Sequence, residues 1–384
     1  MNIKTYDAIV VGCGFAGAVT ANILSEKQNK KVLIVEKRNH IGGNCYDEKD
    51  EYGVLIHKYG PHIFHTNSKK VFEYLSEYTE WYDYSHEVVA KVGDEYIPVP
   101  FNLNSLKKVY GENCAKVLAN KLIDQYEYGR KVPILELRNS SDEDVRGIAD
   151  YVYENVFLKY TMKQWGQTPE QIDPAVTARV PVLVSDDNRY FQDTYQGMPK
   201  DGYTKVFEKM LDNPNITVML GQDAAECIEF DDNGIKVFDQ YFIGDIIFTG
   251  PIDELFGCRY GRLPYRTLKF EFEHKDEDSY QPNAVVNYTV SEDYTRITEY
   301  KKLTGQIIDG TTIMREYPMA YTGEDGQIPY YSIINDENVE LYNKYVTLVK
   351  KYRNFHLLGR LAEYKYYNID AIVEKAMELA ERLA

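Results

Sequence analysis

The chain has 384 residues, a length that allows two or three domains around one cleft or one domain with large insertions. Lys and Arg number 44 against 60 Asp and Glu, so the net charge is −16 at pH 7. A nucleic acid or an anionic membrane would be repelled by this charge, and we exclude both as partners.

The cysteine and hydropathy patterns bear on disulfides, metal sites and membrane insertion. The five cysteines are scattered, with no CxxC pair and no histidine at metal-ligand spacing, so we expect reduced thiols and no metal site. No stretch approaches the roughly eighteen apolar residues of a membrane span, and the first strand begins near Tyr6, too early to follow a signal peptide. We therefore expect a cytoplasmic protein without membrane insertion.

The first elements in chain order are a strand over 6–11 and a glycine turn over 12–17. Gly12 permits the turn, Gly14 lets the backbone approach a pyrophosphate, and Gly17 lets the next helix, 18–25, pack closely on the sheet. The N-terminus of that helix offers free N–H groups to a diphosphate. A second buried strand over 32–35 ends at Glu36, whose carboxylate can accept hydrogen bonds from a ribose diol. The pattern predicts a βαβ unit that binds a dinucleotide.

The residues after Glu36 distinguish one dinucleotide from another. A glycine doublet, Gly42-Gly43, follows within seven residues and precedes Asn44. This continuation resembles the glutathione-reductase-like FAD-binding flavoproteins and implies FAD, with Arg38 near the adenosine half. The alternative for Arg38 is a solvated loop residue. The cofactor contacts expected in this unit are Gly12, Gly14, Phe15, Ala16, Gly17, Glu36, Lys37, Arg38, Gly43 and Asn44.

The later segments complete a mixed α/β fold. Runs over 217–220, 245–251 and 355–360 predict further strands of the same sheet, and a helix over 369–383 closes the domain. Helical periodicity marks 104–110, 114–128 and 142–159, whereas 179–200 and 259–335 alternate as strands do. We expect a Rossmann-like FAD-binding domain (1–80, 200–255 and 337–384), an inserted helical domain (100–165) and an antiparallel β-sheet substrate domain (81–99, 166–199 and 256–336).

Two arginine-bearing stretches stand beside aromatic residues. Tyr160 to Gly166 precedes Arg179, and Tyr294 lies two residues before Arg296. Guanidinium groups suit a diphosphate, and aromatic faces suit a nucleobase. On chemistry alone, surface ion pairs are an equally good interpretation of these arginines.

The motifs taken together resemble the bacterial UDP-galactopyranose mutases over nearly the whole chain. The most specific segments are YGPHIFHT at 59–66 and KQWG at 163–166. Further matching segments lie at 187–191, 266–268, 294–297, 315–317, 329–331, 359–361 and 364–366.

The resemblance implies an isomerase that interconverts UDP-galactopyranose and UDP-galactofuranose. Reduced FAD is the active form in this family, and its N5 is the nucleophile that forms a covalent flavin–sugar adduct and expels UDP. The resemblance also implies a homodimer. Two other functions stay open: an FAD-dependent oxidoreductase of amine-oxidase type, which shares the N-terminal fingerprint, and a catalytically silent nucleotide-sugar binder.

The resemblance also assigns roles position by position. Arg179, on a lid, and Arg296 match the arginines that hold the diphosphate, and His65 matches a histidine beside the flavin. Tyr160 matches the ring that stacks on uracil. The other expected substrate contacts are Phe157, Thr161, Trp165, Tyr190, Arg266, Asn287, Glu316, Tyr331, Tyr366 and Asn368. The expected cofactor contacts outside the βαβ unit are His62, Arg360 and Tyr366.

The chain departs from the common pattern of this family at four positions. Leu183 stands where an arginine is frequent, His86 replaces an asparagine, Val156 replaces a phenylalanine and Asn368 replaces an aspartate. None of these changes removes Arg179 or Arg296. We expect them to affect the outer uridine pocket and the affinity, and to leave the reaction class intact.

Overall fold

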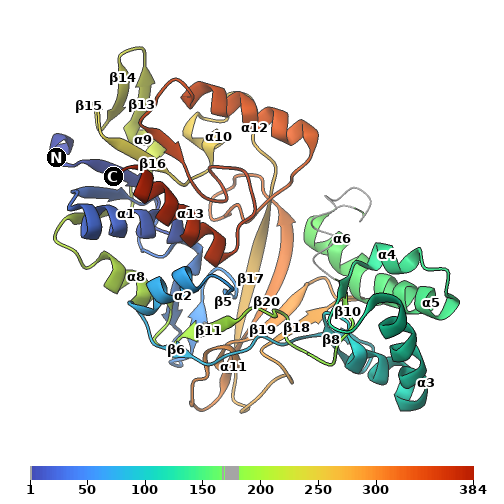
Figure 1. Cartoon of the computed structure of the whole chain (residues 1–384). Helices are drawn as coiled ribbons and strands as arrows, with labels where there is room; N and C mark the ends of the chain where they lie inside the picture. Colours follow the sequence, from blue (N-terminus) through green and yellow to red (C-terminus); the bar gives the residue numbers. More distant parts are fainter. Residues whose placement is uncertain (1, 167, 169–180) are drawn as a thin grey trace.

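The structure, a computed structural model, describes residues 2–166, 168 and 181–384. The part of the molecule at the left of Figure 1 contains a five-stranded sheet in the order β12-β2-β1-β16-β22. All four neighbouring pairs are parallel. The strands are Ile216–Met219, Val32–Val35, Ala8–Val11, Asp245–Phe248 and Phe355–Leu357. Because short apolar runs form buried parallel strands, all five were identifiable from the sequence.

The two faces of this sheet enter two separate hydrophobic cores. Ala8 and Val10 of β1 pack on the side of helices α1 (Phe15–Gln28) and α13 (Ile369–Arg382). These two helices, from opposite ends of the chain, lie side by side (Figure 1). Ile9 and Val11 pack on the other side, with α12 (Asp336–Val349). The domain is therefore discontinuous in sequence, as predicted.

Shorter elements surround the parallel sheet. Helices α2 (Lys69–Ser76) and α8 (Tyr203–Leu211) contribute to the core with α1. The opposite face carries α9 (Ala224–Cys227), α10 (Ile252–Leu255) and a small sheet of β13, β14 and β15. The strands of that sheet are Ile228–Asp231, Gly234–Val237 and Gln240–Phe242.

A helical lobe projects from the rest of the molecule (Figure 1). It contains α3 (Leu103–Tyr126), α4 (Ile134–Arg138), α5 (Glu143–Val152), a π-helical turn η3 (Tyr153–Leu158) and α6 (Lys159–Trp165). The sequence predicted a break between 110 and 114, and the structure shows a kink in α3 at Gly111, whose φ is 75°. Gly tolerates this left-handed conformation without the steric cost of a side chain.

A seven-stranded sheet lies between the parallel sheet and the helical lobe, in the order β21-β17-β20-β19-β18-β7-β8. Its strands are Tyr331–Ser332, Tyr265–Lys275, Thr311–Ala320, Arg296–Glu299, Val285–Tyr288, Val88–Val92 and Glu95–Val99. The sequence predicted an antiparallel sheet, but β7 pairs with β18 in parallel. The two strands lie far apart in the chain, so local alternation could not reveal their direction.

The segment 166–199 contributes no strand to this sheet over its described residues. Strand β10 (Val182–Leu183) pairs with β9 (Lys131–Val132) of the helical lobe. Strand β11 (Tyr195–Pro199) pairs with β5 (Phe64–Thr66) and β6 (Trp81–Tyr82). The sequence placed this segment in the substrate domain. In the structure, β10 instead pairs with a strand of the helical lobe, and β11 pairs with β5 and β6.

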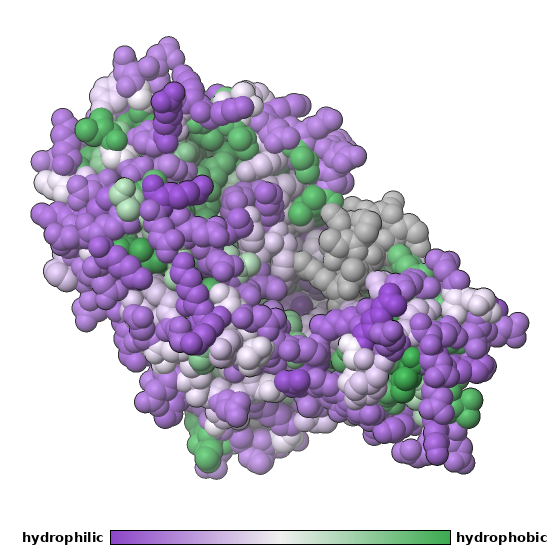
Figure 2. All heavy atoms as spheres, in the orientation of Figure 1, coloured by the Kyte–Doolittle hydropathy of each residue, from purple (hydrophilic) through white to green (hydrophobic). Residues whose placement is uncertain are grey.

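Hydrophilic residues dominate the face shown in Figure 2, in keeping with the charged composition. All five cysteines are free. Within the described ranges, no helix is long and apolar enough to cross a bilayer. The remaining short elements are η1 (Ile3–Thr5), η2 (Gly43–Cys45), β3 (Asp47–Lys49), β4 (Leu55–His57) and α11 (Tyr300–Thr304).

Candidate active site

A cavity of about 550 Å³ lies at the carboxyl ends of the parallel strands. Ligands of open α/β sheets bind at this edge, outside the carboxyl ends of the strands. Its walls come from the glycine turn after β1 and from the residues that follow β2, β16 and β22. The predicted cofactor residues in its lining are Gly12, Gly14, Phe15, Ala16, Glu36, Lys37, Arg38, Gly43, Asn44, His62 and Arg360.

The glycine turn is shaped by close backbone contacts. A Cβ on Gly17 would overlap the carbonyl oxygen of Gly12, so Gly17 lets α1 approach the turn and does not line the cavity. Gly43 has φ of 56°, and a Cβ there would lie 2.9 Å from the Cα of Gly14. Two glycine backbones therefore meet at the cavity wall, which leaves room for a ligand to approach both main chains.

Glu36 has a structural role in the turn as well as a place in the cavity. Its Oε2 accepts a hydrogen bond from the backbone N–H of Cys13 at 2.7 Å, and its Oε1 accepts one from the N–H of Arg38 at 2.9 Å. A carboxylate has about four acceptor positions. Glu36 therefore orients the turn and retains acceptor capacity for a hydroxyl in the cavity.

Arg38 is held inside the cavity. Its Nη2 donates to Oδ1 of Asn44 at 2.7 Å, and its guanidinium lies 4.4 Å from the ring centroid of Tyr59. Its Nη1 is buried and has no hydrogen-bond partner among the described residues. Because an unpaired buried donor is costly, this atom fits a polar or anionic group of a bound ligand. The interpretation of Arg38 as a solvated loop residue is therefore wrong.

His62 also lines the cavity and is neutral. Its Nδ1 donates to the carbonyl oxygen of Gly60 at 2.8 Å, and its backbone N–H donates to Nδ1 of His57 at 3.1 Å. Burial, reinforced by His57 and by nearby arginines, lowers the pKa of His62 to about 3. The bond to Gly60 fixes the proton on Nδ1, so Nε2 is an acceptor.

His65 does not line this cavity. Its ring stacks on Phe191 with centroids 3.6 Å apart, and its Nδ1 lies 3.0 Å from Oδ2 of Asp193. His65 is in β5, which pairs with β11, whereas His62 precedes the strand. His62 lines the cofactor cavity and His65 does not, and the place of His65 beside the flavin stays a prediction.

Arg296, Glu316 and Asn287 lie side by side on three neighbouring strands. The register pairs Asn287 with Arg296 and Arg296 with Glu316. Nε and Nη2 of Arg296 both lie 3.1 Å from Oε1 of Glu316, which is 2% exposed. The side-chain carbonyl oxygen of Asn287 is buried without a partner within the described part of the chain.

Three tyrosines surround this arginine. Burial lowers the pKa of Arg296, but Glu316 and the tyrosines Tyr160, Tyr331 and Tyr190 outweigh it, so the pKa lies well above its usual value. Burial raises the pKa of Tyr331 to about 12, which keeps its hydroxyl protonated. The arrangement presents one fixed positive charge among aromatic rings with polar tips, a combination that suits a nucleotide diphosphate.

A row of rings joins this region to the cofactor cavity. Trp165 lies 5.8 Å from Tyr331, and Tyr331 stacks on Tyr366 at 6.3 Å. The guanidinium of Arg360 lies 4.5 Å from the Tyr366 ring, and its Nε donates to the carbonyl of Tyr367 at 2.6 Å. Tyr366 itself does not line the cavity, but it contacts Arg360, which does.

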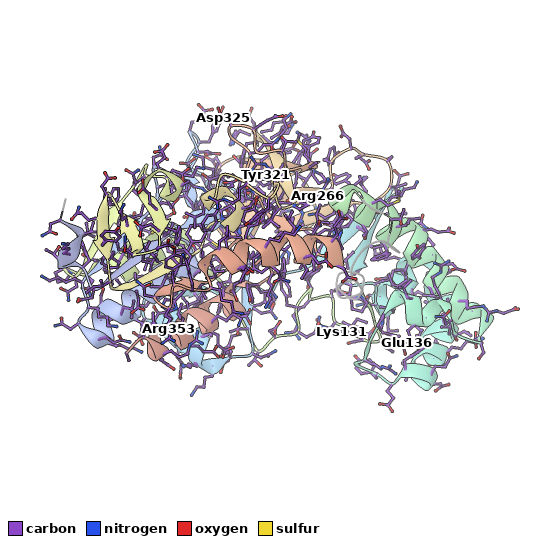
Figure 3. The ribbon with its side chains drawn as sticks, turned by 90° about the horizontal axis from the view of Figure 1, so that it is seen from above. Lys131, Glu136, Arg266, Tyr321, Asp325 and Arg353 are labelled. Carbon is purple, nitrogen blue, oxygen red and sulfur yellow. The ribbon has the colours of Figure 1, made fainter. Side chains whose placement is uncertain are left out.

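The guanidinium of Arg266 donates hydrogen bonds to backbone carbonyls. Its Nε donates to the carbonyl of Gln164 at 3.0 Å, and its Nη2 donates to that of Lys163 at 3.1 Å. It lies where β17 meets helix α6 (Figure 3). A cation at the last carbonyls of a helix is favourable for the helix dipole. Arg266 thus holds the helix that carries Tyr160, whereas the sequence assigned it to the substrate.

The remaining predicted residues fall in several places. Phe157, in the π-helical turn, and Thr161 are buried in the helical lobe. Asn368 caps α13 and lines the cofactor cavity, although the sequence assigned it to the substrate. Arg179 lies outside the described residues.

Three of the four departures from the family pattern are buried. Val156 and Leu183 belong to apolar surroundings of the helical lobe, with 4% and 2% exposure. His86 has its Nδ1 2.9 Å from the hydroxyl of Tyr84. Burial, with the nearby charge of Arg296, lowers the pKa of His86 to about 3.

Sequence reasoning missed several residues of the site. Tyr59 and Thr249 line the cavity, and His57 supports His62. Tyr59 stands directly before Gly60, so its position in the YGPHIFHT segment was an available signal. Thr249 follows β16, and the rule that parallel strands bind ligands at their carboxyl ends could have identified it. Nothing local in the sequence marks His57 as the partner of His62.

Comparison with known proteins gives full-length relatives. A family model described as UDP-galactopyranose mutase matches residues 155–366, and a model for an NAD(P)-binding Rossmann-like domain matches 10–78. The UDP-galactopyranose mutase of Mycoplasma pneumoniae is 35% identical, over 100% of this chain and 97% of that protein. A dTDP-fucopyranose mutase of Escherichia coli is 34% identical, over 97% of both chains.

A solved structure supports the fold. The crystal structure of a reduced UDP-galactopyranose mutase superposes with a TM-score of 0.70, covering 99% of this chain and 95% of that chain. At 15% identity the match speaks for the fold alone. It agrees with the mixed α/β architecture and the Rossmann-like domain described above.

Proposed function

Because the chain belongs to the UDP-galactopyranose mutase family, we propose that it interconverts UDP-galactopyranose and UDP-galactofuranose with the help of reduced FAD. The observation that carries this proposal is the position of Arg296. Its guanidinium is held by buried Glu316, and the rings of Tyr331 and Tyr366 lie between this region and the dinucleotide cavity. A diphosphate at Arg296 would place its sugar toward the cofactor.

The residues of the cavity fit FAD. The two facing glycine backbones and the N-terminus of α1 suit the pyrophosphate, and Glu36 suits the ribose. The unpaired Nη1 of Arg38 is a donor for the adenosine half, and His62 and Arg360 add further polar groups to the lining. When bound in its reduced form, FAD supplies N5 as a nucleophile toward the anomeric carbon of the sugar.

The protein's own contribution is to hold charge and orientation. Nε of Arg296 donates to Glu316 and Nη2 forms an ion pair with the same oxygen, which leaves Nη1 for a phosphate oxygen. A fixed positive charge in a site from which water is largely excluded stabilises the negative charge on departing UDP. Arg179, outside the described residues, stays a prediction from the family resemblance as the second arginine.

In this proposal, residues of helix α6 bind the nucleobase of the substrate. Tyr160 and Trp165 are on this helix, and Tyr160 lies close enough to Arg296 for its charge to affect the tyrosine pKa. An aromatic face next to the diphosphate group is suited to stacking on uracil. Tyr190 and Tyr331 then flank the diphosphate with neutral hydroxyl groups.

A second candidate is the corresponding reaction of a dTDP-6-deoxyhexose. The dTDP-fucopyranose mutase of E. coli is 34% identical to this chain, and the M. pneumoniae UDP-galactopyranose mutase is 35% identical. Overall identity therefore does not separate the two substrates. Their bases differ by a methyl group, their riboses by a 2′-hydroxyl and their sugars by a 6-hydroxyl.

Direct competition between the two substrates tests the assignment. Dithionite-reduced protein is incubated without oxygen with equal concentrations of UDP-galactofuranose and dTDP-fucofuranose, and the products are separated by chromatography. We expect UDP-galactopyranose to form first. Faster formation of dTDP-fucopyranose would establish the second candidate. Failure of both conversions, with oxygen uptake on addition of an amine, would establish an oxidoreductase.

A further inference from the structure

Lys163, on helix α6, uses its ammonium group entirely within the protein. Nζ donates to the backbone carbonyls of Tyr288 at 2.6 Å, Glu292 at 2.9 Å and Tyr294 at 3.1 Å. An ammonium group has three N–H donors, and three acceptors are in place. The ammonium group of a surface lysine hydrogen-bonds to water and its side chain changes rotamer freely. The three carbonyls instead hold the side chain of Lys163 in one position.

The three carbonyls belong to one connection, between β18 and β19. Asn287 precedes Tyr288 at the end of β18, and Arg296 follows Tyr294 by two residues at the start of β19. The backbone N–H of Tyr288 donates to the carbonyl of Thr295 at 2.8 Å and closes the connection. The rings of Tyr288 and Tyr294 pack edge to face at 4.8 Å. The connection is therefore a compact unit that carries Arg296.

Helix α6 is fixed from a second side. Arg266 of β17 donates to the carbonyls of Lys163 and Gln164, at the C-terminal end of the helix. Lys163 thus offers its own carbonyl to Arg266 and its ammonium group to the β18–β19 connection. Through this residue, the helix with Tyr160 and the hairpin with Arg296 are joined by direct hydrogen bonds.

We propose that Lys163 is a positioning residue that sets the distance between the nucleobase ring of Tyr160 and the diphosphate charge of Arg296. The proposal rests on the function proposed above and extends it to a residue that does not itself touch the nucleotide. Without Lys163, α6 keeps its contact with Arg266 but loses its connection to the hairpin. The two halves of the nucleotide site are then no longer held at one separation.

The test replaces Lys163 with methionine, which retains an unbranched apolar side chain and removes all three donors. Lys159→Met is the matched control, because Lys159 is exposed at the start of the same helix. UDP affinity of the flavin-loaded protein is measured by calorimetry, well below the melting temperature. We expect the Kd of Lys163→Met to rise about tenfold, because buried carbonyls lose a charged donor. The Lys159→Met protein should bind as wild type does.

Kinetics separate positioning from a general loss of structure. In Lys163→Met, KM for UDP-galactofuranose should rise with the UDP Kd, while kcat and the flavin absorbance spectrum change little. Lys163→Arg, which retains a charged donor, should recover part of the affinity. In a Tyr160→Ala background the effect of Lys163→Met on UDP affinity should shrink to less than about twofold, since the residues act as one unit.

Two results would overturn the inference. One is a Lys163→Met protein that binds UDP as tightly as wild type. The other is an effect of Lys163→Met that is equally large with and without Tyr160. If Lys163→Met does not fold, Lys163→Gln, which lacks the positive charge, takes its place with and without Tyr160 and is judged by the same criteria. A wild-type protein that binds no UDP would instead overturn the proposed function, and the inference with it.

Discussion

Arg296 and Glu316 face each other across β19 and β20: Nε of the arginine donates to Oε1 of the buried carboxylate at 3.1 Å, and Nη2 forms an ion pair with the same oxygen at 3.1 Å. A guanidinium held in this way has one fixed orientation. The pair lies outside the residues that line the dinucleotide cavity. Binding of cofactor and catalysis on substrate should therefore be separable by substitution.

The Arg296→Ala protein should retain its flavin and lose turnover. Removing one preorganised charge-stabilising donor from an active site costs about 10² to 10³ in kcat. The measurement is the rate of UDP-galactofuranose conversion by reduced protein, with the flavin-to-protein ratio from absorbance as the control. Loss of flavin on this substitution would show that Arg296 belongs to the cofactor site.

Gly14 and Gly17 should respond differently to substitution. A Cβ at Gly14 would lie 3.7 Å from the Cα of Gly43, which is an ordinary van der Waals distance. The Gly14→Val protein should therefore fold, but its side chain should fill the space of the FAD pyrophosphate and prevent FAD binding. A Cβ at Gly17 would overlap the carbonyl of Gly12, so Gly17→Ala should lower the free energy of unfolding by about 1–3 kcal/mol. Flavin content and urea unfolding measure the two effects. A fully flavinated Gly14→Val protein would contradict the assignment of this cavity.

His62 and His65 provide a direct test of which histidine faces the cofactor. His62→Phe should shift the flavin absorbance spectrum, because His62 lines the cavity. His65→Phe retains a ring against Phe191 but loses the contact with Asp193. It should destabilise the protein by about 1–3 kcal/mol and leave the spectrum unchanged. The reverse pattern of spectral changes would restore the role that the sequence suggested for His65.

Stability should fall in mild acid because of three buried histidines. Burial is the main cause that lowers the pKa of His57, His62 and His86, each to about 3. Below about pH 6.5 the unfolded chain binds protons at these positions and the folded protein does not. The free energy of unfolding should then drop by up to about 1.4 kcal/mol per pH unit for each histidine, down to pH 3.

Urea unfolding at pH 7.5 and pH 5.5 measures this dependence. His86→Asn should reduce the pH slope, because it removes one of the three groups. An unfolding free energy that is equal at both pH values would show that these histidines are protonated in the folded protein.

Local patterns were sufficient for the parallel sheet and its glycine turn. Strands of three or four residues and the glycine spacing follow from backbone sterics and burial, which act over short distances in sequence. The parallel pairing of β7 with β18 joins residues nearly 200 positions apart, and no local pattern encodes it. The same holds for the segment 166–199, whose strands pair with two different units.

In the candidate site, too, the sequence could identify some residues and could not show the contacts of others. The fingerprint identified lining residues in the glycine turn and after β2, but most of the cavity lining comes from segments outside it. The sequence could not show the contacts of Arg266 and His65, because the position of a side chain depends on contacts made in three dimensions. Arg266 meets helix carbonyls and His65 meets Asp193. In the sequence, an arginine next to aromatic residues has the same pattern whether its guanidinium binds an anion or backbone carbonyl oxygens. The pattern alone therefore could not show that Arg266 contacts carbonyls.

The most direct test of the proposed chemistry is to follow UDP-galactofuranose in parallel with the reduced and the oxidised protein under exclusion of oxygen. We predict that the reduced protein converts it to UDP-galactopyranose over many turnovers without further reductant, and that the oxidised protein converts essentially none. Equal conversion by both forms, or conversion that stops after one equivalent of reductant, would contradict a mutase that depends on reduced FAD.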